Sequence, residues 1–416
     1  MDEQRPARSK LRILLVHNRY RSRFASGENR VVEAEGALLR SGGHEVIEYI
    51  RESDEIERFG LTERLALPAR VVWSREDARA LTRLSLRVRP DVVHIHNTFP
   101  LISLSVLRSF QELSIPVVMT LHNPRLFCAN AQLFRDGRPC EDCLGGSPVP
   151  GVIHACYRGS RAATAPIAAS ILFHRWTHGL SRVDTFITPS SFLRAKVIAG
   201  GLRTDRVVVK PNFVHPPDRL RDGPGIHHLF LGRLSSEKGP DMLAAAWTPD
   251  LGTLLMAGDG PMRDSLASVA AATTGMHLLG HRSADECSDL LRDARALVVP
   301  SRVYEVFPVA VVEAFAHGVP VIAPAHGPFP EIVEGGVRGL LFRPGDVADL
   351  QRCLRALADD GLSRRLGEQA RRTYEDLYTP EHCLRSLESI YRDALEVDRS
   401  RGRRRSGVTA VEGATT

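Results

Sequence analysis

The sequence has no long hydrophobic run. Its first largely apolar run, Leu11 to Val16, spans six residues and is shorter than the apolar core of a secretory signal peptide. No stretch approaches the roughly 18 consecutive apolar residues that a membrane-spanning helix needs. These absences predict a cytoplasmic protein and leave open peripheral contact with the inner face of the membrane.

The sequence also has no strong excess of charge of one sign. With 55 Lys and Arg against 49 Asp and Glu, the net charge is +6. A balance of this size suits an anionic small molecule, an anionic membrane or nucleic acid, and does not distinguish among them. Part of it is local, because 399–405 holds five arginines within a tail, 398–416, that we expect to be disordered. Nucleic-acid binding would depend on this tail alone, so we expect no nucleic-acid partner.

Length and periodicity indicate two α/β domains. A chain of 416 residues is too long for one ordinary core. Short apolar runs alternate with helical patterns, which is typical of mostly parallel sheets with helices on both faces. A proline-rich linker, 211–225, separates the halves. We therefore predict two Rossmann-like domains facing across a cleft, with a closing helix, over the ranges 10–212, 225–375 and 376–397. Strands are expected at 11–17, 44–50, 91–97, 116–122, 184–190, 227–233, 253–260, 296–301 and 320–324, and a helix at about 27–40.

Two segments of the second half suit an anionic ligand. GRLSSEKG, 232–239, follows an expected strand and places Arg233 and Lys238 on a strand-to-helix turn, where both can reach phosphate oxygens. In YEVFPVAVVEAFAHGVP, 304–320, Pro308 suits the first turn of a helix that should begin near Phe307. Glu305 then lies on the entering loop and Glu313 well inside the helix. Free N–H groups at the helix start, around Phe307 and Val309, offer a phosphate site.

Taken in order, GRLSSEKG, AGDGP, the two glutamates separated by seven residues, GVPVIAP and PEIVEGG resemble the retaining GT-B glycosyltransferases of family 4. The resemblance covers nearly the whole chain, from Ile13 to about Tyr391. It implies a GT-B fold and a nucleoside-diphosphate-sugar donor, UDP- or GDP-linked, bound mainly by the second domain. In that family the residues matching Arg233 and Lys238 neutralise the diphosphate. The residues matching Glu313 and Glu305 hold the ribose and the donor sugar.

The same resemblance assigns roles to residues of the first half. The histidine matching His122, at the end of an expected strand, usually bonds the donor sugar and shapes the reacting geometry. FASGENRVVEAE, 24–35, occupies the place of a glycine pair that faces the diphosphate; Ser26 replaces the first glycine and Gly27 is retained. Strand periodicity puts His94 and His96 on one face, where they would either line the acceptor pocket or fill a buried structural role.

No D-x-D sequence occurs in the chain. Enzymes that hold a diphosphate through a divalent cation usually need such closely spaced carboxylates. We therefore expect no catalytic metal, with Arg233, Lys238 and helix N-termini stabilising the leaving group. For a retaining enzyme of this family the resemblance implies same-face attack by the acceptor hydroxyl, whose proton passes to the departing phosphate.

Four of the seven cysteines fall within 29 residues, in the pattern C-x11-C-x2-C-x12-C. They lie in an insertion expected at 124–160, which is rich in turn residues and has few core residues. A cross-link or a bound metal ion would stabilise such a segment. Four thiolates fit a structural zinc ion, while free or redox-active thiols are the alternative. The four residues are Cys128, Cys140, Cys143 and Cys156, and with them the chain resembles a subgroup of the family that has a four-cysteine insertion in the N-terminal domain.

After the cysteines, 157–182 is basic at both ends and apolar between them. It would either lie on a membrane surface or form a helix packed on its own domain. We predict sugar transfer to a glycan or a lipid-linked acceptor in cell-surface polysaccharide or glycolipid biosynthesis. The alternatives are a GT-B-like sugar-nucleotide epimerase, which needs no acceptor site, and a non-enzymic zinc-stapled scaffold.

Overall fold

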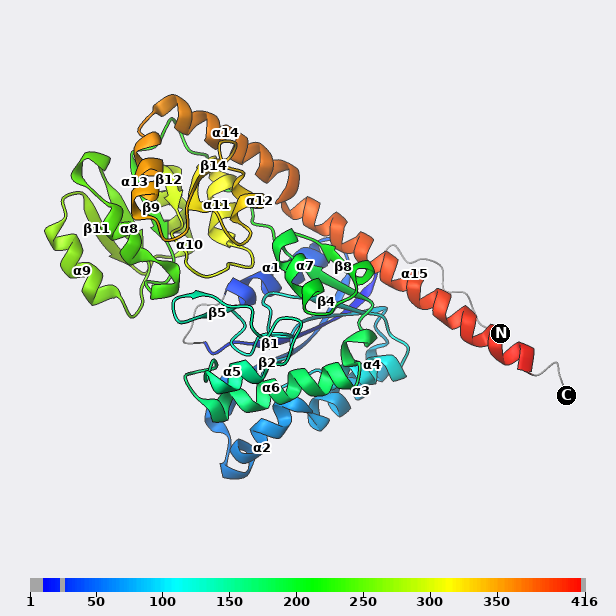
Figure 1. The fold of residues 1–416 in the computed structure, drawn as a ribbon. Coiled ribbons are helices and arrows are strands. Elements are labelled where there is room, and N and C mark those ends of the chain that lie inside the picture. The colour runs from blue at the N-terminus through cyan, green and yellow to red at the C-terminus, as the bar shows by residue number, and fades with distance from the viewer. Residues whose placement is uncertain (1–9, 23–26, 413–416) are drawn as a thin grey trace.

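The protein is built around two six-stranded parallel sheets, which form separate bodies in Figure 1. The structure, a computed structural model, describes residues 10–22 and 27–412, with the side chains of 398–412 left out of the description. This is the α/β architecture with mostly parallel sheets that the sequence predicts. The predicted position of Ser26 lies outside the described residues.

The first sheet has the strand order β2-β1-β3-β4-β7-β8. The chain adds β2 on one side of β1 and then returns to place β3 on the other side, so the order reverses between β1 and β3. Its strands are β1 (Arg12–Arg19), β2 (Glu45–Glu52), β3 (Val92–Asn97), β4 (Val117–Thr120), β7 (Thr185–Thr188) and β8 (Val207–Val209).

The second sheet has the order β11-β10-β9-β12-β13-β14, with the reversal between β9 and β12. Between the sheets, 210–226 forms neither helix nor strand. A short antiparallel pair, β5 (Phe134–Arg135) and β6 (Arg138–Pro139), lies in the cysteine-rich segment. The strands of the second sheet are β9 (His227–Leu231), β10 (Leu254–Ala257), β11 (Met276–Gly280), β12 (Ala294–Val298), β13 (Val321–Pro324) and β14 (Gly339–Phe342).

Helices cover both faces of each sheet, as alternating burial along the strands requires. In β1, Ile13 packs toward α1 and α15, while Leu14 packs toward α3, α4 and α7. In β9, Leu229 and Phe230 divide in the same way between two helical layers. The α-helices are α1 (Gly27–Ser41), α2 (Leu61–Val72), α3 (Arg75–Val88), α4 (Val106–Glu112), α5 (Val149–Ile153), α6 (Arg161–Trp176), α7 (Ser191–Ala199), α8 (Pro240–Ala246), α9 (Arg263–Ala272), α10 (Ala284–Arg292), α11 (Val309–His317), α12 (Phe329–Val333), α13 (Val347–Ala356), α14 (Asp360–Leu377) and α15 (Pro380–Glu412).

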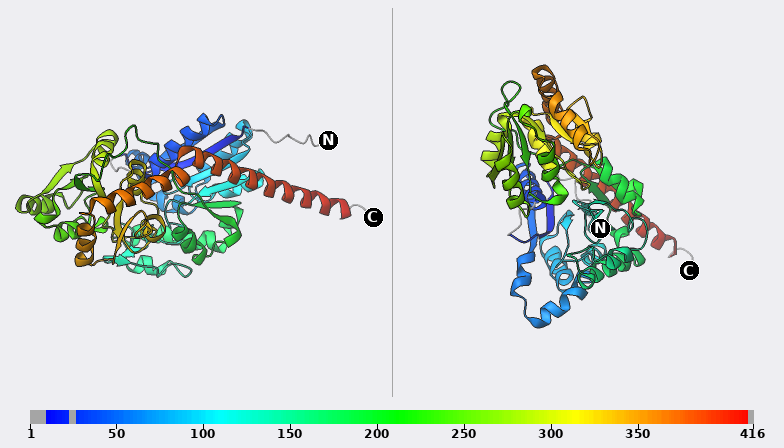
Figure 2. Two further views of the ribbon diagram at one scale, coloured as in Figure 1. Left: turned by 90° about the horizontal axis from the view of Figure 1, so that it is seen from above. Right: turned by 60° about the vertical axis from the view of Figure 1, so that its left-hand side comes forward.

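The last helix returns from the second domain to the first. Cys383, Leu387 and Tyr391 of α15 are buried in one core with strand residues of the first sheet. The helix was expected to end at Val397 before a disordered tail, but α15 continues to Glu412 and projects beyond the body of the molecule in Figures 1 and 2. Arginine has high helix propensity, so a helix already nucleated by packing can extend through this segment.

Candidate active site

The candidate site lies at the carboxyl ends of both sheets. Ligands of open α/β sheets bind where the strand order reverses, which here means beyond β1 and β3 in one domain and beyond β9 and β12 in the other. The loop after β12 touches the first domain directly, because Ser190, which follows β7, donates a hydrogen bond of 2.8 Å to the carbonyl of Val306. The two strand ends therefore share one interdomain region.

Lys238 and Glu305 meet at the second sheet. Lys238 ends a short 3-10 helix after β9, and Glu305 lies on the loop after β12, as the sequence predicts. The Lys238 Nζ atom lies 2.6 Å from Glu305 Oε1, which also accepts a hydrogen bond of 2.8 Å from Ser301. Arg233 is exposed on the turn that precedes Lys238. The Lys238 side chain is 34% exposed, so its ammonium remains accessible to an anionic ligand.

Gly239 sets the position of Lys238. Its φ of +66° is a left-handed conformation, and an added Cβ would lie 2.1 Å from the carbonyl oxygen of Pro300. Glycine accepts both conditions because it has no side chain. The turn after β9 and the loop after β12 can therefore lie in direct contact, which brings Lys238 to Glu305.

Helix α11 carries the second predicted glutamate. The helix begins at Val309, with Pro308 as its N-cap, so the predicted start at Phe307 is two residues early. Phe307 instead packs against Tyr378, with ring centroids 6.0 Å apart. Pro308 cannot donate a backbone hydrogen bond, and the φ and ψ of this residue, −77° and 95°, are extended rather than helical.

Glu313 faces a cation from the other domain. Burial raises the pKa of its carboxyl group, and the positive charge of Arg30 on α1 opposes that rise. Gly27, the first residue of α1, is exposed, and an added Cβ would meet no atom of the described residues within 4 Å. The start of α1 and the middle of α11 are thus electrostatic neighbours. Sequence reasoning missed Arg30, whose position three residues after Gly27 was its only signal.

His122 is held by a second histidine. His96 Nδ1 lies 2.9 Å from His122 Nε2, and the two rings stack with an interplanar angle of 16°. Burial lowers the pKa of both imidazoles well below the usual value, so both are neutral near pH 7. His96 Nε2 lies 3.5 Å from Glu35 Oε1, which favours a proton on that nitrogen. We therefore assign His122 Nε2 as the donor to His96, which leaves His122 Nδ1 as an acceptor.

Glu35 belongs to a buried ion pair. Its Oε2 atom lies 2.7 Å from Lys210 Nζ, and both side chains are 1% exposed. Glu35, His94 and His96 offer ligand atoms within 4.8 Å of one another, close enough to be considered as a metal site. The Lys210 ammonium already supplies the balancing positive charge. The charge of the Glu35 carboxylate is thus balanced, while Glu35 Oε1 and His96 Nε2 have no hydrogen-bond partner among the described residues.

His94 has a structural role. It is fully buried, and its ring nitrogens lie 2.8 Å from Tyr391 Oη and 2.8 Å from Thr120 Oγ1. Burial lowers its pKa to about 4. The two histidines of β3 therefore have different surroundings. His94 links the sheet to α15, whereas His96 contacts His122 at the site.

Glu28 is a site residue that sequence reasoning missed. Asn123, directly after His122, donates a hydrogen bond of 3.1 Å to Glu28 Oε2. Burial raises the pKa of Glu28 to about 7, against the opposing charge of Arg125. Its other oxygen, Oε1, is buried and has no hydrogen-bond partner among the residues that the structure describes. An acceptor or acid-base group of this kind beside His122 can bond a substrate hydroxyl.

The four cysteines lie near one another, but their sulfur atoms are not close enough together to form a metal site. Cys128, Cys140 and Cys156 contribute to the raised pKa of Cys143, although burial is the main cause. Among the described residues, however, the group whose ligand atoms fall within 4.8 Å is the histidine–glutamate cluster, and the cysteines form no such group. Their sulfur atoms would have to draw together to bind a tetrahedral ion. The zinc site stays a prediction.

The basic segment after the cysteines forms a helix that packs on its own domain. α6 buries Ile167, Ala168 and Ile171 and contacts α2. It leaves Trp176 79% exposed. Over the residues that the structure describes, no helix has both the length and the apolar character needed to cross a bilayer.

Comparison with known proteins identifies both halves of the chain. Residues 25–217 match the model of Glycosyltransferase Family 4, and residues 226–360 match that of Glycosyl transferases group 1. Glycogen synthase from Mycobacterium tuberculosis is 26% identical over 399 residues, covering 84% of this chain and 86% of that protein.

Solved structures show the same fold. Sucrose-phosphate synthase from Thermosynechococcus elongatus superposes with a TM-score of 0.66 at 19% identity, over 93% of this chain and all of that one. Anabaena HepE in complex with UDP-glucose superposes with a TM-score of 0.63 at 16% identity, over 92% of this chain and all of that one. The chain is thus a glycosyltransferase of the GT-B fold, whose two domains match the Family 4 and group 1 models.

Proposed function

We propose that this glycosyltransferase moves a sugar from UDP- or GDP-sugar to a glycan or lipid-linked acceptor with retention of configuration. The observation that carries the proposal is the Lys238–Glu305 pair at the β9/β12 reversal, in contact with the domain that bears His122. That HepE was solved with UDP-glucose supports a donor of this class. We place the reaction in cell-surface polysaccharide or glycolipid biosynthesis.

Binding of the donor would break the Lys238–Glu305 ion pair, and each of the two side chains would contact the donor instead. Lys238 would turn from Glu305 to the pyrophosphate, joined by Arg233 and by the N–H groups at the start of α11 and of α1. Glu305, released from the ammonium, would accept hydrogen bonds from the donor sugar. Glu313 would hold the ribose hydroxyls, with Arg30 keeping its carboxylate charged despite burial. Both charges are therefore satisfied before and after binding.

The reaction would need no enzymic nucleophile. The acceptor hydroxyl attacks the anomeric carbon on the face that the diphosphate leaves, and the new glycosidic bond forms as the bond between the anomeric carbon and the diphosphate oxygen breaks. Its proton passes to the departing phosphate oxygen, whose charge Arg233 and Lys238 stabilise without a catalytic metal. Neutral His122 would accept a hydrogen bond from the donor sugar through Nδ1 and fix its orientation.

The test is donor binding and turnover in chelator. A thermal-shift screen with UDP-, GDP- and ADP-sugars in EDTA should raise the melting temperature for one base, since a ligand of the native state stabilises it. Lys238→Met and Glu313→Ala should abolish the shift, whereas Lys10→Met, which removes an exposed ammonium outside the site, should retain it. No binding in chelator, or full turnover by Lys238→Met, would refute the proposal. Epimerised sugar nucleotide formed without acceptor would favour an epimerase instead.

We further propose that the four cysteines bind one structural zinc ion that stiffens the segment around β5 and β6. The support is their spacing in the sequence and their mutual electrostatic influence. Elemental analysis of the purified protein should find one zinc per chain, lost in Cys140→Ser. Retention of a full zinc equivalent in that variant would contradict the assignment.

A further inference from the structure

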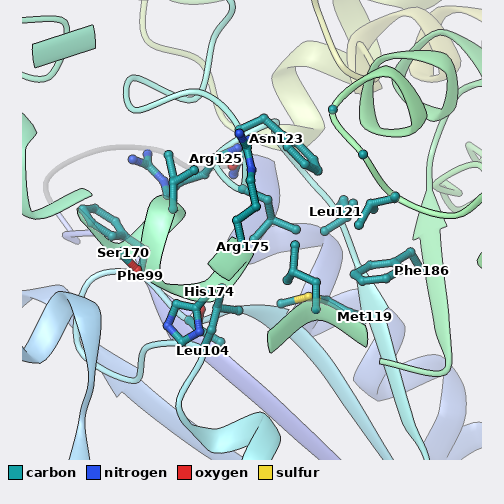
Figure 3. A pocket seen from close by; sticks show the side chains of 18 of the residues that line it. Phe99, Leu104, Met119, Leu121, Asn123, Arg125, Ser170, His174, Arg175 and Phe186 are labelled. Carbon is teal, nitrogen blue, oxygen red and sulfur yellow. Dashed lines mark hydrogen bonds between the residues drawn. The ribbon is translucent and has the colours of Figure 1, made fainter. Parts of the chain in front are cut away.

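A cavity of about 470 Å3 opens beside His122 in the first domain. It reaches from the ends of β3 and β4 to helix α6, within the size range of small-molecule sites. Figure 3 shows side chains from the sheet and from α6 gathered around it. Most of its wall is hydrocarbon, contributed by Phe99, Leu104, Met119, Leu121, Phe127, Ile171 and Phe186.

Two arginines add unpaired donors to this apolar wall. Arg125 Nε and Arg175 Nη2 are buried and have no hydrogen-bond partner within the described part of the chain, while the Nη1 atoms of the two side chains donate to the carbonyls of Ala129 and Gly146. The guanidinium of Arg125 lies over the ring of Phe99, 4.2 Å from its centroid. Both side chains line the cavity, and a buried donor without a partner costs free energy, so a small side-chain shift that brings either N–H to an oxygen atom of a ligand would be favourable. The cavity thus combines a large apolar surface with two cationic donors.

Building on the proposed glycosyltransferase function, we infer that the acceptor is lipid-linked: an isoprenoid or alkyl chain joined through phosphate to the group that receives the sugar. The chain would lie against Phe99, Leu104 and Phe186, and the phosphate oxygens would pair with Arg125 and Arg175. The hydroxyl end would reach His122, which lines the same cavity. A free glycan fits less well, because many of its hydroxyl groups would lose water against a wall whose surface is mostly hydrocarbon.

Chain length provides the first test. We would measure binding of a series of n-alkyl monophosphates, from butyl to dodecyl, by calorimetry below their critical micelle concentrations. Each added methylene should tighten binding about fourfold until the cavity is full, after which affinity should level off. Inorganic phosphate should bind far more weakly than any alkyl member. Equal affinity for inorganic phosphate and for octyl phosphate would overturn the inference.

Filling the cavity provides the second test. Ser170 on α6 lines the cavity, so Ser170→Phe should weaken octyl phosphate at least tenfold, while Ser170→Ala should bind it like wild type. Ser268→Phe makes the same change on exposed helix α9 and should have no effect. Circular dichroism and an unchanged donor-induced thermal shift would establish that Ser170→Phe is folded. Unaltered alkyl phosphate binding in that folded variant would contradict the assignment.

Measurement of donor binding distinguishes a failure of this inference from a failure of the proposed function. If the protein binds UDP- or GDP-sugar and transfers sugar equally well to free and to alkyl-phosphate-linked acceptors, only the lipid assignment fails. If it binds no sugar nucleotide at all, the proposed function fails first. A kcat/KM at least tenfold higher for the alkyl-linked acceptor, lost in Ser170→Phe, would support both.

Discussion

Acidification should unfold this protein steeply, because four histidines are buried in one part of the first domain. Burial lowers the pKa of His17 and His94 to about 4 and those of His96 and His122 well below the usual value. Below pH 6.5 the unfolded chain binds these four protons and the native state does not. Stability is therefore fully present above pH 6.5 and falls as the pH drops toward 4.

The expected slope follows from the proton count. Each proton bound only by the unfolded chain contributes about 1.4 kcal/mol per pH unit, so four contribute about 5 kcal/mol per unit. Glu28 acts in the opposite direction, because its pKa of about 7 exceeds the unfolded value and its native state holds a proton between pH 4.5 and 7. Together these five groups give a slope of about 4 kcal/mol per pH unit. Burial also lowers the pKa of five other histidines, which add to the slope: His174, His227, His228, His317 and His326. A typical stability of 5–15 kcal/mol would be lost within a few pH units.

Urea denaturation at half-unit steps from pH 7.5 to 5 measures this slope directly. His94→Gln should reduce it by about 1.4 kcal/mol per pH unit, because one proton fewer is taken up on unfolding. His281→Gln, at an exposed position, is the matched control and should leave the slope unchanged. A free energy of unfolding that stays level between pH 6.5 and 5 would refute the reasoning, since it would mean that these imidazoles are protonated in the native state.

Three substitutions test other parts of the structure. Lys210→Met should destabilise the fold by about 3–5 kcal/mol in urea denaturation, because it leaves the Glu35 carboxylate buried without its partner. The double variant Glu35→Gln/Lys210→Met should recover most of that loss, because it removes the buried charge as well. Gly239→Ala should lower the free energy of unfolding by about 1–3 kcal/mol, because the left-handed φ of this residue is strained for alanine. The same substitution should move Lys238 and weaken donor binding, and an unchanged donor affinity would contradict the role of Gly239 in positioning Lys238. Glu331→Gln should lower the free energy of unfolding by about 1 kcal/mol in calorimetry, because Glu331 accepts hydrogen bonds of 2.8 and 3.0 Å from the backbone at the start of α7. An unchanged melting temperature would argue against this interdomain contact.

The sequence predicted the fold well where hydrophobic runs were strong. All nine expected strands are present, because each is a short apolar run with clear turn signals at its ends. Among the described residues five strands were missed: the short pair β5 and β6 of the cysteine-rich segment, and β8, β11 and β14 of the two large sheets. β8 has three residues and β14 is only partly buried, while β11 contains a histidine, so none shows a distinct period.

The candidate site was predictable to the extent that it lies on strand ends. Lys238, Glu305 and His122 lie on the connections that follow β9, β12 and β4, so a one-dimensional pattern sufficed to place them. Glu28 and Arg30 lie on the first turn of α1, and only the packing of α1 against the cleft reveals their role. The apolar cavity draws on several elements of the first domain at once, and no local sequence pattern encodes such a convergence.

The last helix explains why the histidine network escapes sequence reasoning. Tyr391 is 297 residues from His94, yet the two side chains are hydrogen-bonded and buried together. Cys383 of the same helix contacts Lys210, so α15 encloses the ion pair that faces His96. Without this cover, water would reach Glu35 and Lys210, and the low dielectric that keeps His96 and His122 neutral would be lost. A helix that follows both domains therefore sets the protonation state of a cleft residue that it does not touch.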